Sequence, residues 1–189
     1  MEKRALMTEI RSSGEGEDKR VSGMGIVYDQ LTELWPGYKE RINKGAVRLA
    51  GTVKSYFNHD PNQILSTIDS NPALEINDTE NGMEYNSPIP PTSYGKNLEI
   101  NLERGNVKGS SFAFDVPKGG DRMWEDEEGV INREIKELVL YEIGPVTDPA
   151  FVQTTANLRT AQEALKRWQQ GKTPARNLRE KRQKLADIL

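Results

Sequence analysis

Short runs of alternating apolar and polar residues, separated by turn residues, dominate the first 150 positions of the chain. This pattern predicts a series of strands, over residues 2–11, 20–28, 53–58, 65–69, 73–76, 110–116 and 135–143. Between two of them, Asn81-Gly82 separates LEIND from MEYNSPI and predicts a tight hairpin turn. Six or more short strands with such punctuation favour a barrel or a sandwich.

Helical patterns interrupt this series of strands. Residues 38–49 predict a short helix, although Gly45 lies within it. A second helix is predicted over 93–103, because Leu98 and Leu102 lie four positions apart and Gly105 follows as a stop signal. The chain is again predicted to be helical from Asp148, with a break at 171–174 and a further helix over 175–189. The acidic segment 121–129 (DRMWEDEEG) is predicted to be a mobile loop between strands.

Composition narrows the classes of protein that the chain can represent. It has 189 residues, only 35% of them hydrophobic, which allows one domain of ordinary size with an appendage. The absence of Cys excludes disulfide scaffolds, thiolate metal sites and cysteine catalysis, and the single His excludes a zinc site built on several histidines. The charged N-terminus does not resemble a secretory signal, and no apolar stretch reaches the length of a membrane span.

Charge is unevenly distributed along the chain. Residues 160–189 hold eight basic and three acidic residues, so this segment carries +5 while residues 1–159 carry −8. An acidic body with a basic tail is a marked asymmetry. The tail alone is compatible with nucleic-acid binding, but the acidic body and the few aromatic residues argue against it. We therefore expect neither a nucleic-acid partner nor a membrane partner.

His59, the single imidazole of the chain, lies in Phe57-Asn58-His59-Asp60-Pro61 at the end of a predicted strand. A strand end holds a side chain rigidly and leaves its tip accessible. Imidazole also titrates close to neutral pH, which suits a general base. Most lone histidines are merely structural. Adjacent strand residues point to opposite faces, so Asp60 is expected to cap the following turn rather than to assist His59.

Two serines precede an alternating aromatic strand in the segment Gly109-Ser110-Ser111-Phe112-Ala113-Phe114. Strand alternation places Ser111 on one face and Ser110 with both Phe side chains on the other. If the Phe side chains face the core, Ser111 is the better candidate for a nucleophile, because a nucleophile needs an accessible Oγ. The plain alternative is that both hydroxyls bond to turn backbone at the start of a strand.

A carboxylate, Glu142, lies within the apolar strand predicted over 135–143, which ends at Gly144-Pro145. A carboxylate in such a strand needs a partner if it is buried. The alternative is a half-exposed Glu on the solvent face of the strand.

Taken together, FNHD, GSSFAF and ELVLYEIGPVTDPAF resemble, in this order and spacing, the prohead (capsid-maturation) serine proteases of tailed bacteriophages. That family is related in fold to the herpesvirus assemblins. The resemblance extends over roughly residues 3–155 and includes RINKGAV and ENGMEYNSPIPPTSYGKNL. It implies a mainly β fold with flanking helices (α+β), in which a closed antiparallel β-barrel carries a helical C-terminal tail. It also implies a prohead protease domain over 1–158 and a basic helical tail over 159–189 that serves as a removable or docking segment.

The resemblance also implies roles for individual residues. His59 matches the general base and Ser111 the nucleophile, while Glu142 matches a recurrent acid that would be the third catalytic member. Assemblins use a second His in that place, which this chain lacks. Gly109 and nearby backbone N–H groups, or the Arg133 side chain, are candidates for the oxyanion hole. No metal or organic cofactor is expected.

The implied activity is that of a serine endopeptidase cleaving scaffold and capsid-precursor segments, and its own chain, inside the immature prohead in the host cytoplasm. A homodimer or higher oligomer is expected by analogy with the assemblins. The alternative function is a non-catalytic capsid-assembly or scaffold-binding β-barrel protein whose basic tail docks on an acidic partner. A working base must reach the nucleophile, so separation of His59 from Ser111 by more than about 8 Å would favour this alternative.

Overall fold

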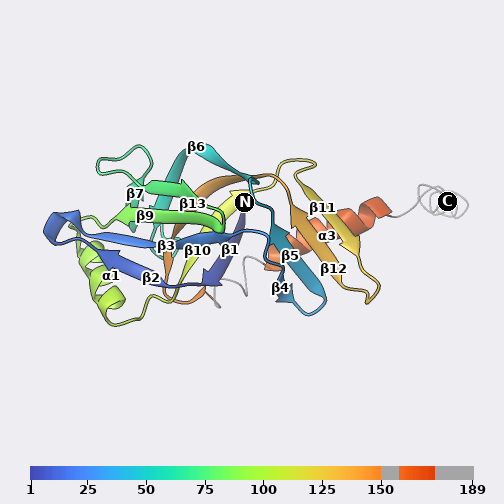
Figure 1. Ribbon diagram of the computed structural model, residues 1–189, viewed down its shortest axis with the longest axis horizontal. Coiled ribbons are helices and arrows are strands. Elements are labelled where there is room, and N and C mark those ends of the chain that lie inside the picture. The colour runs from blue at the N-terminus through green and yellow to red at the C-terminus, as the bar shows by residue number, and fades with distance from the viewer. Residues whose placement is uncertain (150–157, 173–189) are drawn as a thin grey trace, which may run out of the picture.

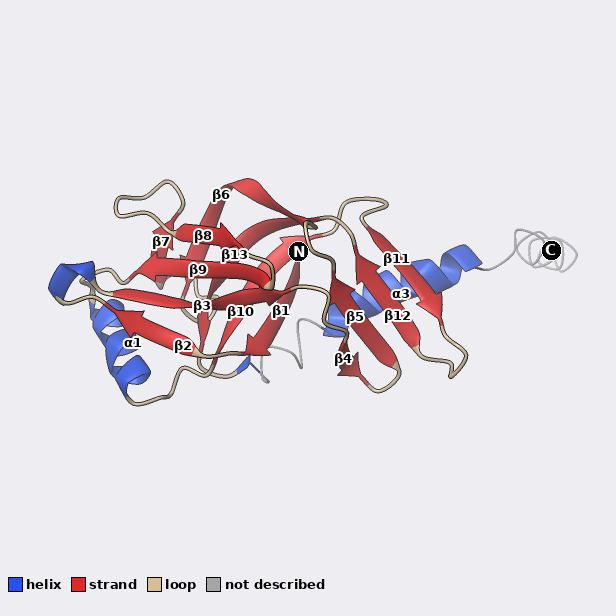
Figure 2. Cartoon of the chain, viewed as in Figure 1, coloured by secondary structure: helices blue, strands red, loops and turns tan. Residues whose placement is uncertain are grey.

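Three β-sheets form the body of the protein, and α-helices lie at its two ends (Figures 1 and 2). The computed structural model describes residues 1–149 and 158–172. The prediction of a mainly β fold with flanking helices is confirmed. No helix in the described part of the chain is long and apolar enough to cross a membrane.

From one edge to the other, the strands of the five-stranded sheet follow the order β1-β10-β13-β6-β7. Its strands are β1 (Glu2–Met7), β10 (Gly109–Asp115), β13 (Leu138–Val146), β6 (Val47–Tyr56) and β7 (Ile64–Thr67). The β13–β6 pair is parallel and the other three pairs are antiparallel. Of these pairings, β1–β10 and β13–β6 join segments far apart in sequence, such as Ala5 with Ser111 and Val47 with Leu138.

Two four-stranded sheets complete the body. The β9 sheet has the order β2 (Ile10–Ser13), β3 (Arg20–Val27), β9 (Gly82–Pro88) and β8 (Glu75–Asp78). The β12 sheet has the order β11 (Asp121–Glu125), β12 (Ile131–Ile135), β5 (Tyr38–Ile42) and β4 (Thr32–Trp35). The predicted hairpin at Asn81-Gly82 is confirmed, because β8 and β9 pair antiparallel with Asp78 opposite Met83.

The main hydrophobic core lies between the five-stranded sheet and the β9 sheet. Phe112 and Phe114 of β10 stack with ring centroids 5.2 Å apart and pack in one cluster with Ile26 and Tyr85 of the β9 sheet. The sheets approach closely at Gly25, where an added Cβ would lie 2.2 Å from Ile143 Cδ1. Both Phe side chains of the GSSFAF segment therefore face the core. This is the condition under which Ser111, rather than Ser110, was the better candidate for a nucleophile.

The helix predicted over 93–103 is confirmed as α1 (Ser93–Glu103). The Thr92 side chain accepts a hydrogen bond from Gly95 N at 3.2 Å and caps its first turn. Gly105, with φ of 67°, follows its end. Leu98 is fully buried and anchors the helix in a second apolar cluster with Val21 and Phe57.

Four expectations are corrected by the structure. The barrel is not closed: among the described strands, β1 and β7 are free edges of the five-stranded sheet, because β4, β5, β11 and β12 pair with one another instead of bridging them. Nor is the pairing wholly antiparallel, since β13–β6 and β12–β5 are parallel. Residues 38–49 are not a helix but contribute to β5 and β6, with a turn at Gly45. Segment 121–129 is not a loop throughout, because its first five residues form β11.

Part of the predicted basic tail is packed against the body. Helix α3 (Leu158–Lys172) buries Ala161 and Ala164. Ala164 and Trp168 line a cavity of about 430 Å³ together with residues of β11 and β12, such as Met123. The division of the chain at 158/159 remains a prediction, and the helix predicted over 175–189 lies outside the described residues.

Candidate active site

Three adjacent strands of the five-stranded sheet position the predicted catalytic residues. Ser111 lies in β10, Glu142 in β13, and His59 in the turn that follows β6. In the β10–β13 ladder, Ser111 is opposite Gly144 and Ala113 is opposite Glu142. Directly opposed residues share a face of a sheet, so Ser111 and Glu142 lie together on the face away from Phe112.

The His59 imidazole lies between the carboxylate and the hydroxyl. Its Nδ1 is 2.6 Å from Glu142 Oε1, and its Nε2 is within hydrogen-bonding contact of Ser111 Oγ. The side chains of His59 and Glu142 are only 7% and 8% exposed, and Ser111 is 1% exposed. The structure thus brings together all three residues that the sequence singled out.

This arrangement fixes how the imidazole can be used. A carboxylate accepts, so Nδ1 carries the proton that is donated to Glu142. In the neutral ring, Nε2 is then an acceptor directed at the Ser111 hydroxyl. Low exposure strengthens these interactions, because water screens them little. A carboxylate, an imidazole and a hydroxyl in this order form a relay suited to activating an oxygen nucleophile.

Ser111 Oγ has a second partner that the sequence did not indicate. It lies 2.7 Å from the backbone oxygen of Arg4, in the neighbouring strand β1. A hydroxyl has one proton, so it donates either to Arg4 O or to neutral His59. Donation to Arg4 O leaves the hydroxyl as an acceptor for a protonated Nε2. The edge strand β1 therefore contributes directly to the environment of the hydroxyl.

Ser110, the neighbouring hydroxyl, lies in a different environment. Its Oγ donates to Tyr85 OH at 3.2 Å, within the core and on the face opposite to Ser111. Burial raises the pKa of the Tyr85 phenol well above its ordinary value. Within the described residues, no hydrogen bond joins Ser110 to His59.

Asp60 caps the turn after His59, as expected. Its carboxylate accepts hydrogen bonds from Gln63 Nε2 and Asn62 N, both at 2.9 Å. These bonds, with that of the Gln63 side chain the strongest, lower the pKa of Asp60. Asp60 is thus engaged in the loop rather than with the imidazole.

Arg133 does not occupy the position that an oxyanion donor would need. Its guanidinium is 1% exposed and donates to Glu2, Glu40 and Asp121 at 2.7 to 3.0 Å. The Arg4 side chain donates to the same Glu2 and Glu40, both at 2.7 Å. This buried ionic cluster joins β1 to the β12 sheet, so the proposal of Arg133 as an oxyanion donor is wrong. The role of Gly109 remains a prediction.

The ionic cluster also determines the state of Glu2. Burial alone would raise the pKa of this carboxyl, but the hydrogen bonds and charges of Arg133 and Arg4 outweigh burial and hold the pKa at about 2. Glu2 is therefore ionised at neutral pH. The ionised Glu2 keeps β1 attached to the β12 sheet. The same strand, β1, provides the Arg4 backbone oxygen that contacts Ser111 Oγ.

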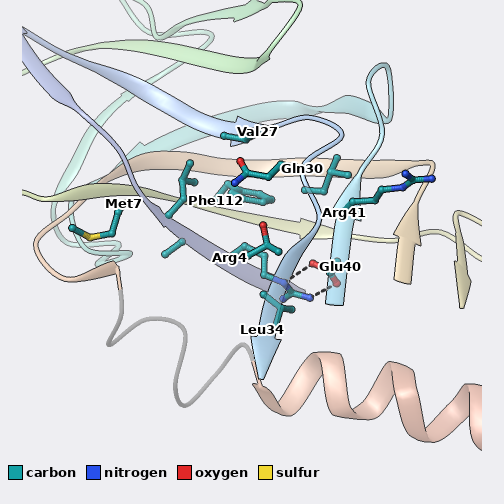
Figure 3. A pocket seen from close by; sticks show the side chains of 12 residues that line it. Arg4, Met7, Val27, Gln30, Leu34, Glu40, Arg41 and Phe112 are labelled. Carbon is teal, nitrogen blue, oxygen red and sulfur yellow. Dashed lines mark hydrogen bonds and ion pairs between the residues drawn. The ribbon is translucent and has the colours of Figure 1, made fainter. Parts of the chain in front are cut away.

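A cavity of about 290 Å³ runs beside β1 (Figure 3), and none of the three candidate residues is among the described residues that line it. Arg4, Gln30, Glu40 and Phe112 are among its lining residues. Phe112, which lines it, lies on the face of β10 opposite to Ser111, while Ala5, which also lines it, is directly opposite Ser111 in the β1–β10 ladder. No group of three or more Asp, Glu, His or Cys side chains in residues 1–149 and 158–172 is placed to hold a metal ion.

Comparison with known proteins points in the same direction as the geometry. The family model described as caudovirus prohead serine protease matches residues 7–168. Among solved structures, the chain is similar to the capsid assembly protease gp21 of bacteriophage T4, with a TM-score of 0.46 and 13% sequence identity. That alignment covers 77% of this chain and 99% of the T4 chain. None of the curated proteins compared with the chain matches it.

Proposed function

Because the chain belongs to the caudovirus prohead serine protease family, we propose that it is a serine endopeptidase with Ser111 as nucleophile, His59 as general base and Glu142 as the acidic third member. The observation that carries this proposal is the continuous contact from Glu142 through His59 to Ser111. Family membership itself makes the chain a phage capsid-maturation protease; the assignment of each residue's role is the proposal.

The reaction follows the acyl-transfer sequence of serine proteases. Ser111 Oγ attacks the scissile carbonyl carbon while His59 Nε2 accepts the hydroxyl proton. The C–N bond then breaks, and Nε2 returns that proton to the leaving amine. Water attacks the resulting ester in the second half, losing a proton to Nε2, and Ser111 Oγ leaves with that proton. Glu142 accepts the hydrogen bond from Nδ1–H throughout and stabilises the imidazolium in both halves.

The substrates that we propose are segments of the capsid precursor and of the scaffold protein, cleaved within the prohead in the infected cell, together with segments of this chain itself. The alternative of a non-catalytic assembly protein requires no contact among the three side chains. Their contact therefore favours the enzyme. We also propose a homodimer or higher oligomer, which sedimentation over a range of protein concentrations would test.

The decisive variants are the two adjacent serines. Purified protein incubated with the capsid precursor is expected to produce defined fragments, and Ser111→Ala is expected to abolish them. Ser110→Ala is the matched control, because it removes a hydroxyl of the same strand that faces the core. Thermal unfolding of both variants verifies that they are folded. Equal cleavage by Ser111→Ala and the parent would contradict the proposal, as would loss of cleavage in Ser110→Ala alone.

A further inference from the structure

His59 lies in an unusual stretch of backbone. Both Asn58 and His59 have positive φ, 55° and 59°. Side chains other than Gly rarely adopt this conformation, although Asn adopts it more readily than most. Two consecutive residues of this kind persist only where their surroundings hold them in place. The contacts of Asn58 are therefore informative about how the imidazole is positioned.

Asn58 is attached to the end of strand β13 by three hydrogen bonds. Its backbone N–H donates to Pro145 O at 3.1 Å. Its side-chain Oδ1 accepts from Thr147 N at 2.9 Å and from Thr147 Oγ1 at 3.2 Å. Strand β13 also provides Glu142, the partner of His59 Nδ1, and pairs directly with the Ser111 strand.

From this geometry we infer that Asn58 is a positioning residue for the proposed catalytic base, acting through its attachment to Thr147. Strand β13 and the residue that follows it then set the imidazole from both sides. Glu142 contacts its ring, and Pro145 and Thr147 hold the preceding residue, Asn58. This inference rests on the proposed function for its kinetic consequence, but not for its structural one. Asn58 is exposed, so its substitution leaves the core intact.

A small displacement of a base has a large kinetic effect, because proton transfer requires hydrogen-bonding distance; a misplacement of about 1 Å can cost about 10²-fold in rate. Asn58→Gly removes Oδ1 but retains a residue that adopts positive φ without strain. It therefore isolates the side-chain attachment from the backbone conformation. We expect kcat to fall by about 10- to 100-fold, with KM changed less than about threefold.

Three further variants separate positioning from general loosening of the loop. Asn62→Gly makes the same substitution four residues later in the same loop and is expected to retain the parent kcat. Thr147→Val removes the Oγ1 donor and leaves the N–H donor, so its effect is expected to be smaller than that of Asn58→Gly. In the Asn58→Gly background, Thr147→Val is expected to have no additional effect, because its acceptor is already absent.

The single histidine allows a test that does not depend on activity. In protein labelled with ¹⁵N-histidine, one set of imidazole signals reports on His59. The parent and Asn62→Gly are expected to show one sharp Nδ1–H signal protected by Glu142, and Asn58→Gly is expected to shift and broaden it. Kinetics are measured on a peptide spanning a cleavage site mapped with the parent enzyme.

The possible outcomes distinguish this inference from the proposed function. An unchanged Nδ1–H signal in Asn58→Gly, together with kcat within about twofold of the parent, would overturn the positioning role. If Ser111→Ala cleaves like the parent, the proposed function fails, and the Nδ1–H signal of Asn58→Gly alone then tests the inference. A shifted and broadened signal would support the positioning role, and an unchanged signal would overturn it. An equal loss of signal and rate in Asn62→Gly would also overturn it, because general loosening would explain both.

Discussion

Replacing Glu142 with Gln tests the carboxylate that contacts His59. The substitution retains the size of the side chain and an oxygen that can accept a hydrogen bond from Nδ1–H. It removes the negative charge. That charge lies 2.6 Å from the ring nitrogen at a buried position. In the ground state the ring is neutral, so the charge matters most when the imidazolium forms during Ser111 attack.

The size of the effect follows from Coulomb's law. Two unit charges with centres about 4 Å apart interact by about 4 kcal/mol at an effective dielectric constant of about 20. At about 1.4 kcal/mol per factor of ten, this corresponds to a loss of about 10³ in kcat, reduced by whatever the Gln oxygen retains. We therefore expect kcat to fall by about 10² to 10³, with little change in KM.

The assay measures initial rates of precursor cleavage at several substrate concentrations, with urea unfolding to verify the fold. Glu137→Gln is the matched control, because Glu137 lies on the same stretch of chain but forms an exposed ion pair with Arg48. It is expected to retain the parent rate. A kcat for Glu142→Gln within about threefold of the parent would contradict this role of Glu142, because its charge would then not stabilise the His59 imidazolium in the transition state.

Three further predictions concern stability and the spacing of strands. The pKa of Glu2 lies at about 2 in the folded protein and near 4.5 when unfolded, so the stability it contributes is present above about pH 4.5 and is lost as pH falls toward 2. Urea unfolding at pH 6, 4 and 3 should show a decline of about 2 kcal/mol between pH 6 and pH 3, whereas a flat profile would contradict the role of the ionic cluster. Gly144→Ala places a Cβ 2.5 Å from Tyr56 O, so it should displace the chain leading to His59 and lower kcat; an unchanged rate and an unchanged His59 Nδ1–H signal would contradict this. Leu98→Ala should reduce the free energy of unfolding by about 2 to 5 kcal/mol in urea, because Leu98 is fully buried, and a loss below about 1 kcal/mol would mean that α1 is not anchored there.

Local signals explain which parts of the fold could be predicted from sequence. The limits of α1 were correct because a cap and a stop are encoded within one turn of each end, by Thr92 and Gly105. The β8–β9 hairpin was predicted correctly because Asn81-Gly82 marks a turn between two strand patterns, although the connection spans residues 79–82 rather than these two alone. Both depend on residues only a few positions apart.

The errors come from interactions between distant residues. Residues 38–49 were predicted to be a helix, whereas Glu40 of β5 is buried against Arg4 and Arg133, 36 and 93 positions away. No local pattern shows that a charged residue will be buried with its partner. Strand β11 was missed for the same reason, because its pairing with β12 stabilises it. Arg133 was given a wrong role because its buried carboxylate partners are also distant in sequence.

The candidate site was found for a different reason. His59 was singled out by scarcity, and the alternation around Phe112 distinguished Ser111 from Ser110. Glu142 could be identified only as a carboxylate within an apolar strand. Their meeting depends on the order β10-β13-β6, which is set by long-range pairing. The Arg4 backbone oxygen could not be anticipated, because a main-chain contact carries no residue signature.

Covalent labelling is the most direct test that Ser111 is the nucleophile. A fluorophosphonate reacts with an activated serine hydroxyl, forming a P–O bond and releasing fluoride, and mass spectrometry of the digested protein locates the adduct. We expect a single adduct on Ser111, absent in Ser111→Ala and retained in Ser110→Ala. An adduct on Ser110 or elsewhere, or precursor cleavage that continues at full rate after Ser111 is fully labelled, would contradict it.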